Sequence, residues 1–194
     1  MNISGALKRQ DAATHGDLKS KAPGRYPATV RVVHWLTVLA VAAAYALVQF
    51  GGEHAQTGVA PAPLQWHFLA GLVVLVLLAV RLPALAMARI PPIQPTPGRL
   101  TGSVARVTHL ALYAFLLAQP VLGILQVNLA GDAVTLPGGW SLPALVHADH
   151  AWHERIGELH EELGEIFYWV IGLHVAAALW HHLVVRDNTL RRML

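Results

Sequence analysis

The sequence predicts an all-α integral membrane protein, a four-helix bundle. Of its 194 residues, 55% are hydrophobic and only 13% are charged, which is about half the charged share of an ordinary soluble domain. Four apolar stretches are each long enough to cross a bilayer as a helix. They lie at about 30–50, 64–87, 102–128 and 161–185. Membrane lipid is therefore the first expected partner, and residues 28–194 are expected to form a single membrane domain.

The segment before the first span is polar. Residues 1–27 carry charges of both signs and contain no apolar run, whereas a cleavable signal peptide needs one near its start. We expect a poorly ordered cytoplasmic tail here. Cysteine is absent from the chain, which excludes disulfides, thiolate metal ligands and covalent haem attachment. No nucleic-acid partner is expected.

The first three spans each contain a histidine. His34 lies one turn inside the first span, and His67 opens the second. Gly71 follows His67 by one turn, where a glycine allows either a bulky group to approach the backbone or close helix packing. The third span contains His109 and an expected kink at Pro120.

Three histidines share one face of the fourth span: His160, His174 and His181. His160 and His174 are fourteen residues apart, so they nearly superimpose in projection and lie about 21 Å apart along the helix axis. That separation suits two flat iron macrocycles stacked across a membrane, each held by an imidazole. The alternative is a helix whose scattered polar residues pack against neighbouring helices.

The positions of Lys and Arg predict the topology. With four spans, every cation except Arg155 falls on one side of the membrane, so both termini are expected to be cytoplasmic. His67 and His160 then lie at similar depth near the outer surface and can bracket one iron. His34 lies near the cytoplasmic surface, and depth slightly favours His181 among its candidate partners, which are His109, His174, His181 and His182.

Several short motifs, each different from the others, lie along residues 28–194. They are Val33-His34-Trp35-Leu36, Gln65-Trp66-His67, Thr108-His109-Leu110, Gln119-Pro120-Val121-Leu122-Gly123, His160-Glu161, residues 170–178 (VIGLHVAAA), His181-His182 and Asp187-Asn188-Thr189-Leu190. With these motifs the chain resembles the prokaryotic cytochrome b561 family, four-helix membrane proteins that hold two b-type haems.

The resemblance implies a set of haem ligands. His34 and His174 would ligate the iron of one haem b, and His67 and His160 would ligate the iron of the other, both haems being bound without a covalent link. His109 matches a family histidine that is not a ligand. The outer connection matches the family weakly.

Iron with two axial imidazoles has no open coordination site, which favours outer-sphere electron transfer over oxygen activation. The resemblance implies an oxidoreductase of the bacterial inner membrane, of the superoxide oxidase or quinone reductase type. Electrons would pass between an outer-side donor, with superoxide as the candidate, and membrane ubiquinone. Two other functions stay open. One is a cytochrome b subunit that anchors a hydrogenase- or dehydrogenase-like complex, in which case a protein partner is expected. The other is a histidine-lined metal transporter.

Two residues are candidates for contacts with substrates. His181 lies near the cytoplasmic end, on the same face as His160 and His174, and is the candidate for the quinone site; alternatively it is an interfacial side chain that meets water. Arg155 is the only outer cation and could steer an anionic donor. Its alternative is an ordinary ion pair with Glu154 or Glu158.

Other polar residues have weaker assignments. The outer group His147, His150, His153 and Glu154 resembles a zinc site, although His150 and His153 lack a convincing third ligand. On the cytoplasmic side, haem propionates could pair with arginines, or the arginines could serve only to mark topology. These arginines are Arg31, Arg106 and Arg186.

Overall fold

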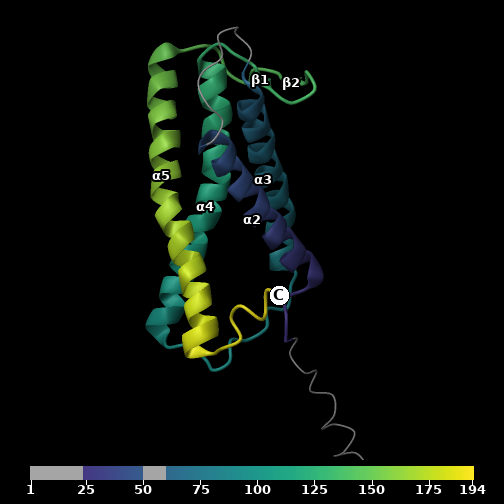
Figure 1. The fold of residues 1–194 in the computed structure, drawn as a ribbon, viewed down its shortest axis with the longest axis vertical. Helices are drawn as coiled ribbons and strands as arrows, with labels where there is room; N and C mark the ends of the chain where they lie inside the picture. Colours follow the sequence, from purple (N-terminus) through teal and green to yellow (C-terminus); the bar gives the residue numbers. More distant parts are fainter. Residues whose placement is uncertain (1–23, 50–59) are drawn as a thin grey trace, which may run out of the picture.

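The structure is a computed structural model that describes residues 24–49 and 60–194. Four helices dominate it: α2 (Ala28–Gln49), α3 (Ala62–Ala86), α4 (Arg99–Leu129) and α5 (His150–Trp180), the last continuing as the short π-helix η1 (His181–Val185) (Figure 1). Among the described residues, four helices are long and apolar enough to cross a membrane. The all-α, four-span prediction is therefore confirmed. Most of the tail 1–27, and His54 in the first connection, lie outside the described residues.

The fourth helix is longer than expected. The membrane span was expected at about 161–185, with a short amphipathic helix at the end of the preceding connection running into it, and in the structure the two form one continuous helix α5 from His150. No proline interrupts residues 150–185, and the helix start is capped by Asp149, whose carboxylate accepts hydrogen bonds from the backbone N–H groups of Ala151 (3.1 Å) and Trp152 (3.2 Å). Such a cap satisfies amide groups that a helix start leaves unpaired.

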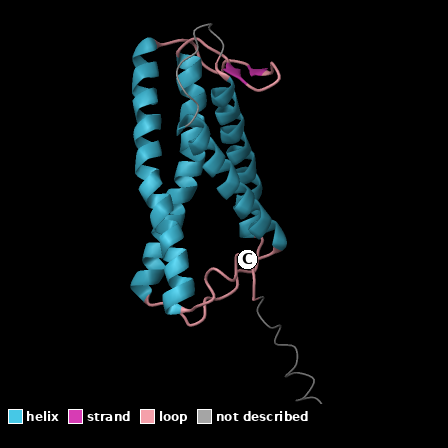
Figure 2. Cartoon of the chain, in the orientation of Figure 1, coloured by secondary structure: helices cyan, strands magenta, loops and turns pink. Residues whose placement is uncertain are grey.

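A small hairpin lies between α4 and α5. Strands β1 (Val134–Thr135) and β2 (Ser141–Leu142) pair antiparallel, and Figure 2 shows them at one end of the bundle. The turn between them contains Gly138 and Gly139, both at positive φ (87° and 81°), a conformation that suits glycine. The hairpin contacts the ends of α3 and α4 and so covers this end of the bundle.

The helices pack as two pairs. Helix α2 packs against α3 and α4 against α5, and α3 joins the pairs by packing against α4. Within the described part of the chain, α5 shares no Cα–Cα pair within 8 Å with either α2 or α3. The histidines of α5 therefore face those of α2 and α3 across an interior that only side chains, or a bound group, can fill.

The outer surface of the bundle is apolar. Large hydrophobic side chains point away from the interior, among them Leu39 (65% exposed), Leu110 (71%) and Trp169 (83%). A soluble protein rarely leaves so many such side chains exposed, whereas hydrocarbon surrounds them in a bilayer. The surface therefore agrees with the membrane assignment.

The last residues of the chain join the two helix pairs. Helix η1 ends at Arg186, which adopts a left-handed conformation (φ 58°), and residues 186–194 then run back across the base of the bundle (Figure 1, yellow). We call this segment the C-terminal strap. The Arg192 guanidinium donates to the Pro91 carbonyl, and the Trp35 indole donates to the Met193 carbonyl (3.0 Å). The strap thus contacts both the start of α2 and the connection between α3 and α4.

Candidate functional site

His67 and His160 face one another toward the end of the bundle that carries the β1–β2 hairpin, which the positions of Lys and Arg predict to be the outer end; we call them the outer pair. Their ring centres are 6.3 Å apart and their planes lie at 83°. The Nδ1 atom of His67 is 2.9 Å from the Ala44 carbonyl oxygen, and that of His160 is 3.1 Å from the Gln119 carbonyl oxygen. With Nδ1–H donating to a carbonyl, each ring keeps Nε2 as its free ligand atom. The structure therefore brings together the two histidines that were predicted to lie at the same depth.

The spacing of this outer pair fits one metal ion between two rings. A metal–imidazole bond is about 2.0 Å long and the ring centre lies about 1 Å beyond the nitrogen. Two imidazoles on opposite sides of one metal ion therefore have ring centres about 6 Å apart. The observed 6.3 Å agrees with that geometry.

Cavities flank the outer pair on two sides. The larger, of about 370 Å³, is lined by His67 and His160, by apolar side chains of α2, α3 and α4, and by polar side chains that include Glu161 and Glu165 of α5. The smaller is lined by the same two histidines and by apolar side chains such as Leu72 and Ile124. Gly71 lines both. A Cβ atom at Gly123 would lie only 3.2 Å from Cε1 of His160, so the glycine allows the ring its position. Two imidazoles, apolar walls and small residues beside the ring suit a haem held without a covalent link.

Gln119 and Tyr45 hold α5 in place at this level. The side-chain amide of Gln119 donates to the backbone carbonyl of His160 (2.7 Å). The backbone carbonyl of Gln119 accepts a hydrogen bond from the His160 ring. The Tyr45 hydroxyl donates to the Gly164 carbonyl (2.8 Å), which links α2 to α5. Sequence reasoning noted Gln119 only as part of a motif and did not single out Tyr45; a polar side chain inside an apolar span was the available signal.

Three more histidines gather nearer the opposite end of the bundle, where the C-terminal strap lies and which is predicted to be cytoplasmic. His109 on α4 and His174 on α5 have ring centres 5.4 Å apart, and His34 on α2 lies within electrostatic range of both. His109 Nδ1 is 2.6 Å from the Ala105 carbonyl of its own helix. Depth alone favoured His181 as the partner of His34, but the structure bonds His181 to the C-terminal strap instead.

Arg81 belongs to this cluster and was not singled out from the sequence. It was counted only among the cations that predict the topology, whereas the structure places it inside α3 with a buried side chain. Its Nε donates to the Tyr113 hydroxyl (3.2 Å) and its Nη1 to the Val30 carbonyl (3.4 Å). A lone arginine before the end of an apolar run was the signal that could have identified it.

An aromatic layer separates the two histidine levels. The rings of Phe115 on α4 and Phe167 on α5 stack at 4.1 Å with an interplanar angle of 10°. Phe167 is seven residues from both His160 and His174, so it lies midway along the face that they share. The two levels are therefore separated by apolar side chains.

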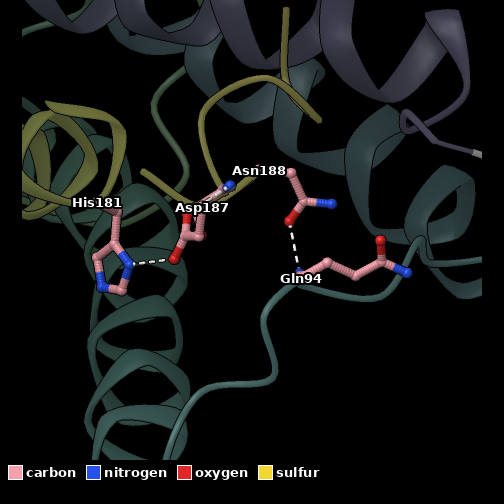
Figure 3. A network of polar contacts seen from close by, with 5 residues as sticks. Gln94, His181, Asp187 and Asn188 are labelled. Atoms are coloured by element: carbon pink, nitrogen blue, oxygen red, sulfur yellow. Dashed lines mark hydrogen bonds and ion pairs between the residues drawn. The ribbon is translucent and has the colours of Figure 1, made fainter. Parts of the chain in front are cut away.

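His181 forms an ion pair with the strap. Its Nδ1 is 2.5 Å from Oδ2 of Asp187, and the two side chains point toward one another in Figure 3. The Asp187 side chain is buried, which alone would raise its pKa, but hydrogen bonds from the Thr189 backbone N–H (2.8 Å) and from His181 hold that pKa below its ordinary value. Beside this pair, the Asn188 side chain accepts from the Gln94 backbone N–H (2.8 Å). The Asp187 carboxylate thus fixes the orientation of the His181 ring.

The position of Arg155 differs from one of the two alternatives given for it. Arg155 lies with its guanidinium carbon 6.0 Å from the centre of the Trp152 ring. Among the described residues the only ion pair is that of His181 with Asp187, so the expected pairing of Arg155 with Glu154 or Glu158 is not formed.

The outer histidines were the candidates for zinc. The His153 Nδ1 lies 2.9 Å from the Gln126 carbonyl, which holds that ring against α4. In the part of the chain that the structure describes, no group of three His, Cys, Asp or Glu side chains could hold a metal ion.

The three arginines considered for haem propionates are placed differently from Arg81. Arg31 donates to the Leu194 carbonyl in the strap, and Arg106 donates to the Gly102 carbonyl of its own helix (3.2 Å). Arg186 is exposed and ends η1.

Comparison with known proteins agrees with this architecture. The prokaryotic cytochrome b561 family matches residues 25–194. The chain is 33% identical over 162 residues to a probable superoxide oxidase CybB of Yersinia pestis, covering 84% of this chain and 91% of that protein. It is 32% identical over 171 residues (88% and 97%) to cytochrome b561 homolog 1 of Escherichia coli K12, and 28% identical over 179 residues (90% and 94%) to homolog 2. Because the family match covers nearly the whole chain and the four spans, this is a bacterial membrane electron-transfer protein of the haem-binding prokaryotic cytochrome b561 family.

Proposed function

We propose that this cytochrome holds two b-type haems and passes electrons from superoxide on the outer side of the inner membrane to ubiquinone near the cytoplasmic side. One observation carries most of the proposal: His67 and His160 face one another at 6.3 Å with both Nδ1 atoms on backbone carbonyls. The name of the Yersinia relative, probable superoxide oxidase, supports the choice of donor.

In this proposal the four histidines act in two pairs. His67 and His160 hold the outer haem, and His34 and His174 hold the cytoplasmic one. When bound, each haem supplies a one-electron couple. Iron held by two imidazoles would support electron transfer and not oxygen binding. The backbone carbonyls of Ala44 and Gln119 hold the rings of His67 and His160 with Nδ1–H donating, so that each ring keeps Nε2 free as a ligand atom.

The overall reaction balances across the membrane. Two superoxide anions each give up one electron and become O₂, while ubiquinone takes up two electrons and two protons and becomes ubiquinol. With both termini cytoplasmic, His181 lies on the side where protons are taken up. Its Nδ1 is held by Asp187, so Nε2 is the atom that can pass a proton to the quinone.

Haem stoichiometry tests the proposal directly. Wild-type protein should contain two haems by pyridine haemochrome, and replacing His67 or His160 with Ala should remove the outer haem while the other is retained. Replacing His34 or His174 should remove the other haem and spare the outer one. The matched control is His109→Ala, a variant that should still bind two haems per chain. A single haem in the wild type would contradict the two-haem assignment.

A kinetic test addresses the reaction. Stopped-flow mixing of the oxidised protein with superoxide should reduce both haems, and added ubiquinone should reoxidise them. Absence of reduction by superoxide, together with purification in a stable complex with another protein, would instead favour the role of a cytochrome b anchor subunit.

A further inference from the structure

A buried cation lies inside the membrane domain at Arg81. Its side chain is only 9% exposed and lies within α3, where a charged group is costly and is usually retained for function. No carboxylate neutralises it among the described residues, since the only ion pair there is that of His181 with Asp187. The guanidinium is held by neutral partners, namely the Tyr113 hydroxyl and the Val30 carbonyl.

The partners of Arg81 place it at the level of the cytoplasmic histidines. Val30 is one helical turn before His34 on α2, and Tyr113 is one turn after His109 on α4. His109, one turn from Tyr113, has its ring centre 5.4 Å from that of His174. The positive charge of Arg81 is therefore fixed beside the pair proposed to hold the cytoplasmic haem, and the larger cavity at the outer pair is not lined by this residue.

We infer that Arg81 raises the reduction potential of the cytoplasmic haem above that of the outer haem. This inference rests on the ligand pairs proposed above. A fixed positive charge disfavours the oxidised form of a nearby haem, because that form carries one more positive charge than the reduced form. The effect is large where the dielectric constant is low and where mobile ions do not screen the charge. Arg81 would thus act through its fixed charge, without binding the iron. The higher reduction potential of the cytoplasmic haem would favour electron transfer to it from the outer haem.

A purely structural role makes a different prediction. Arg81 could serve only to join α2 and α4 through its two hydrogen bonds. In that case any loss of hydrogen bonding should have the same effect as loss of charge. Arg81→Gln and Arg81→Met remove the charge, Arg81→Lys keeps it without the planar guanidinium, and Tyr113→Phe removes one hydrogen bond while the arginine stays.

The experiment is an equilibrium redox titration of the purified, haem-loaded full chain, followed by haem absorbance and fitted with two components. In Arg81→Gln we expect the potential of one component to fall and that of the other to stay near the wild-type value. The component that shifts should be the one missing from His34→Ala. Arg81→Lys and Tyr113→Phe should stay near the wild type, and raising the salt concentration should leave the difference between Arg81→Gln and wild type in place.

Three results would overturn the inference. The first is two haems with unshifted potentials in Arg81→Gln. The second is an equal fall in Tyr113→Phe, and the third is loss of haem from both neutral variants and from Arg81→Lys, which would identify a structural clamp. A wild type that binds only one haem would instead contradict the proposed function, so the two failures are distinguishable.

Discussion

At the scale of single residues, the outer pair depends on small contacts around two rings. The His160 ring is held by the Gln119 carbonyl on one side and lies close to Gly123 on the other. Both neighbours belong to α4, one turn apart. A ligand ring has to be held in one orientation to bind a metal well, so changes beside the ring should affect haem binding more than changes of the same size elsewhere.

We predict that Gly123→Ala weakens binding of the outer haem. The added Cβ would lie 3.2 Å from Cε1 of His160, and such overpacking typically costs about 1–3 kcal/mol, which corresponds to a loss of affinity of roughly 5- to 150-fold. Haem content after competition with apomyoglobin measures the effect. Gly172→Ala is the control, because a Cβ there meets nothing within 4 Å. Equal haem retention in the two variants would show that the His160 ring has room to move.

At the scale of elements, the C-terminal strap crosses the end of the bundle that is predicted to be cytoplasmic and contacts both helix pairs there. Its first turn holds His181 through Asp187, and its later residues bond to α2 and to the α3–α4 connection. The strap therefore links the two helix pairs at the level where the quinone is proposed to react. Its polar contacts with the rest of the bundle link residues 94 to 163 positions apart in the sequence, from Asn188 with Gln94 to Leu194 with Arg31.

We predict that His181→Ala keeps both haems but slows oxidation of the reduced protein by ubiquinone, because the variant lacks the imidazole that passes the proton. Asp187→Asn should slow the same step less, since the ring remains but loses its charged partner. Stopped-flow reoxidation measures both rates. An unchanged rate in His181→Ala would place the quinone site elsewhere.

We also predict that the stability of Asp187→Asn relative to wild type depends on pH. The pKa of Asp187 is lowered in the folded state, so its ionised form stabilises the protein above the ordinary carboxyl pKa and loses this effect as the pH falls through the lowered value. Asp187→Asn should therefore be less stable than wild type at neutral pH, by about 1–3 kcal/mol for the lost charged hydrogen bonds. Thermal unfolding should show this difference shrinking in acid, and a constant difference would argue against the carboxylate as its cause.

At the scale of the whole molecule, the charges are divided between the two ends. The outer connections carry several carboxylates, and Arg155 is their only Lys or Arg. Arg155 is exposed and free of an acidic partner among the described residues. An anionic donor approaching this end would otherwise meet a mostly acidic surface, so a single exposed cation can raise the rate of encounter.

We predict that Arg155→Glu slows reduction by superoxide several-fold, in the range expected for loss of local steering, and that the wild-type rate falls as salt concentration rises. Arg99→Glu, which makes the same charge change at the opposite end of the bundle, is the control and should leave the rate near the wild-type value. Reduction of either variant by a neutral donor should be unchanged. If superoxide reduces all three proteins at one rate, Arg155 serves a structural role against Trp152.

The four spans, and the position of His160 and His174 on one face of a helix, can be predicted from the sequence alone. Hydropathy and helical periodicity are local properties of a chain, so they can be read from neighbouring residues. The similar depth of His67 and His160 followed from the topology, and the structure brings the two rings together.

The contacts between side chains of different helices could not be predicted from the sequence and are seen in the folded structure. Arg81 was counted only as a cation that marks topology, but in the structure its side chain is buried. His181 was a possible partner for His34, but its ring is hydrogen-bonded to Asp187. Helix packing depends on the rotation and tilt of each helix against the next, which many weak contacts set jointly. Hydropathy gives the depth of a residue in the membrane but not the direction in which its side chain points, and that direction decides its partners.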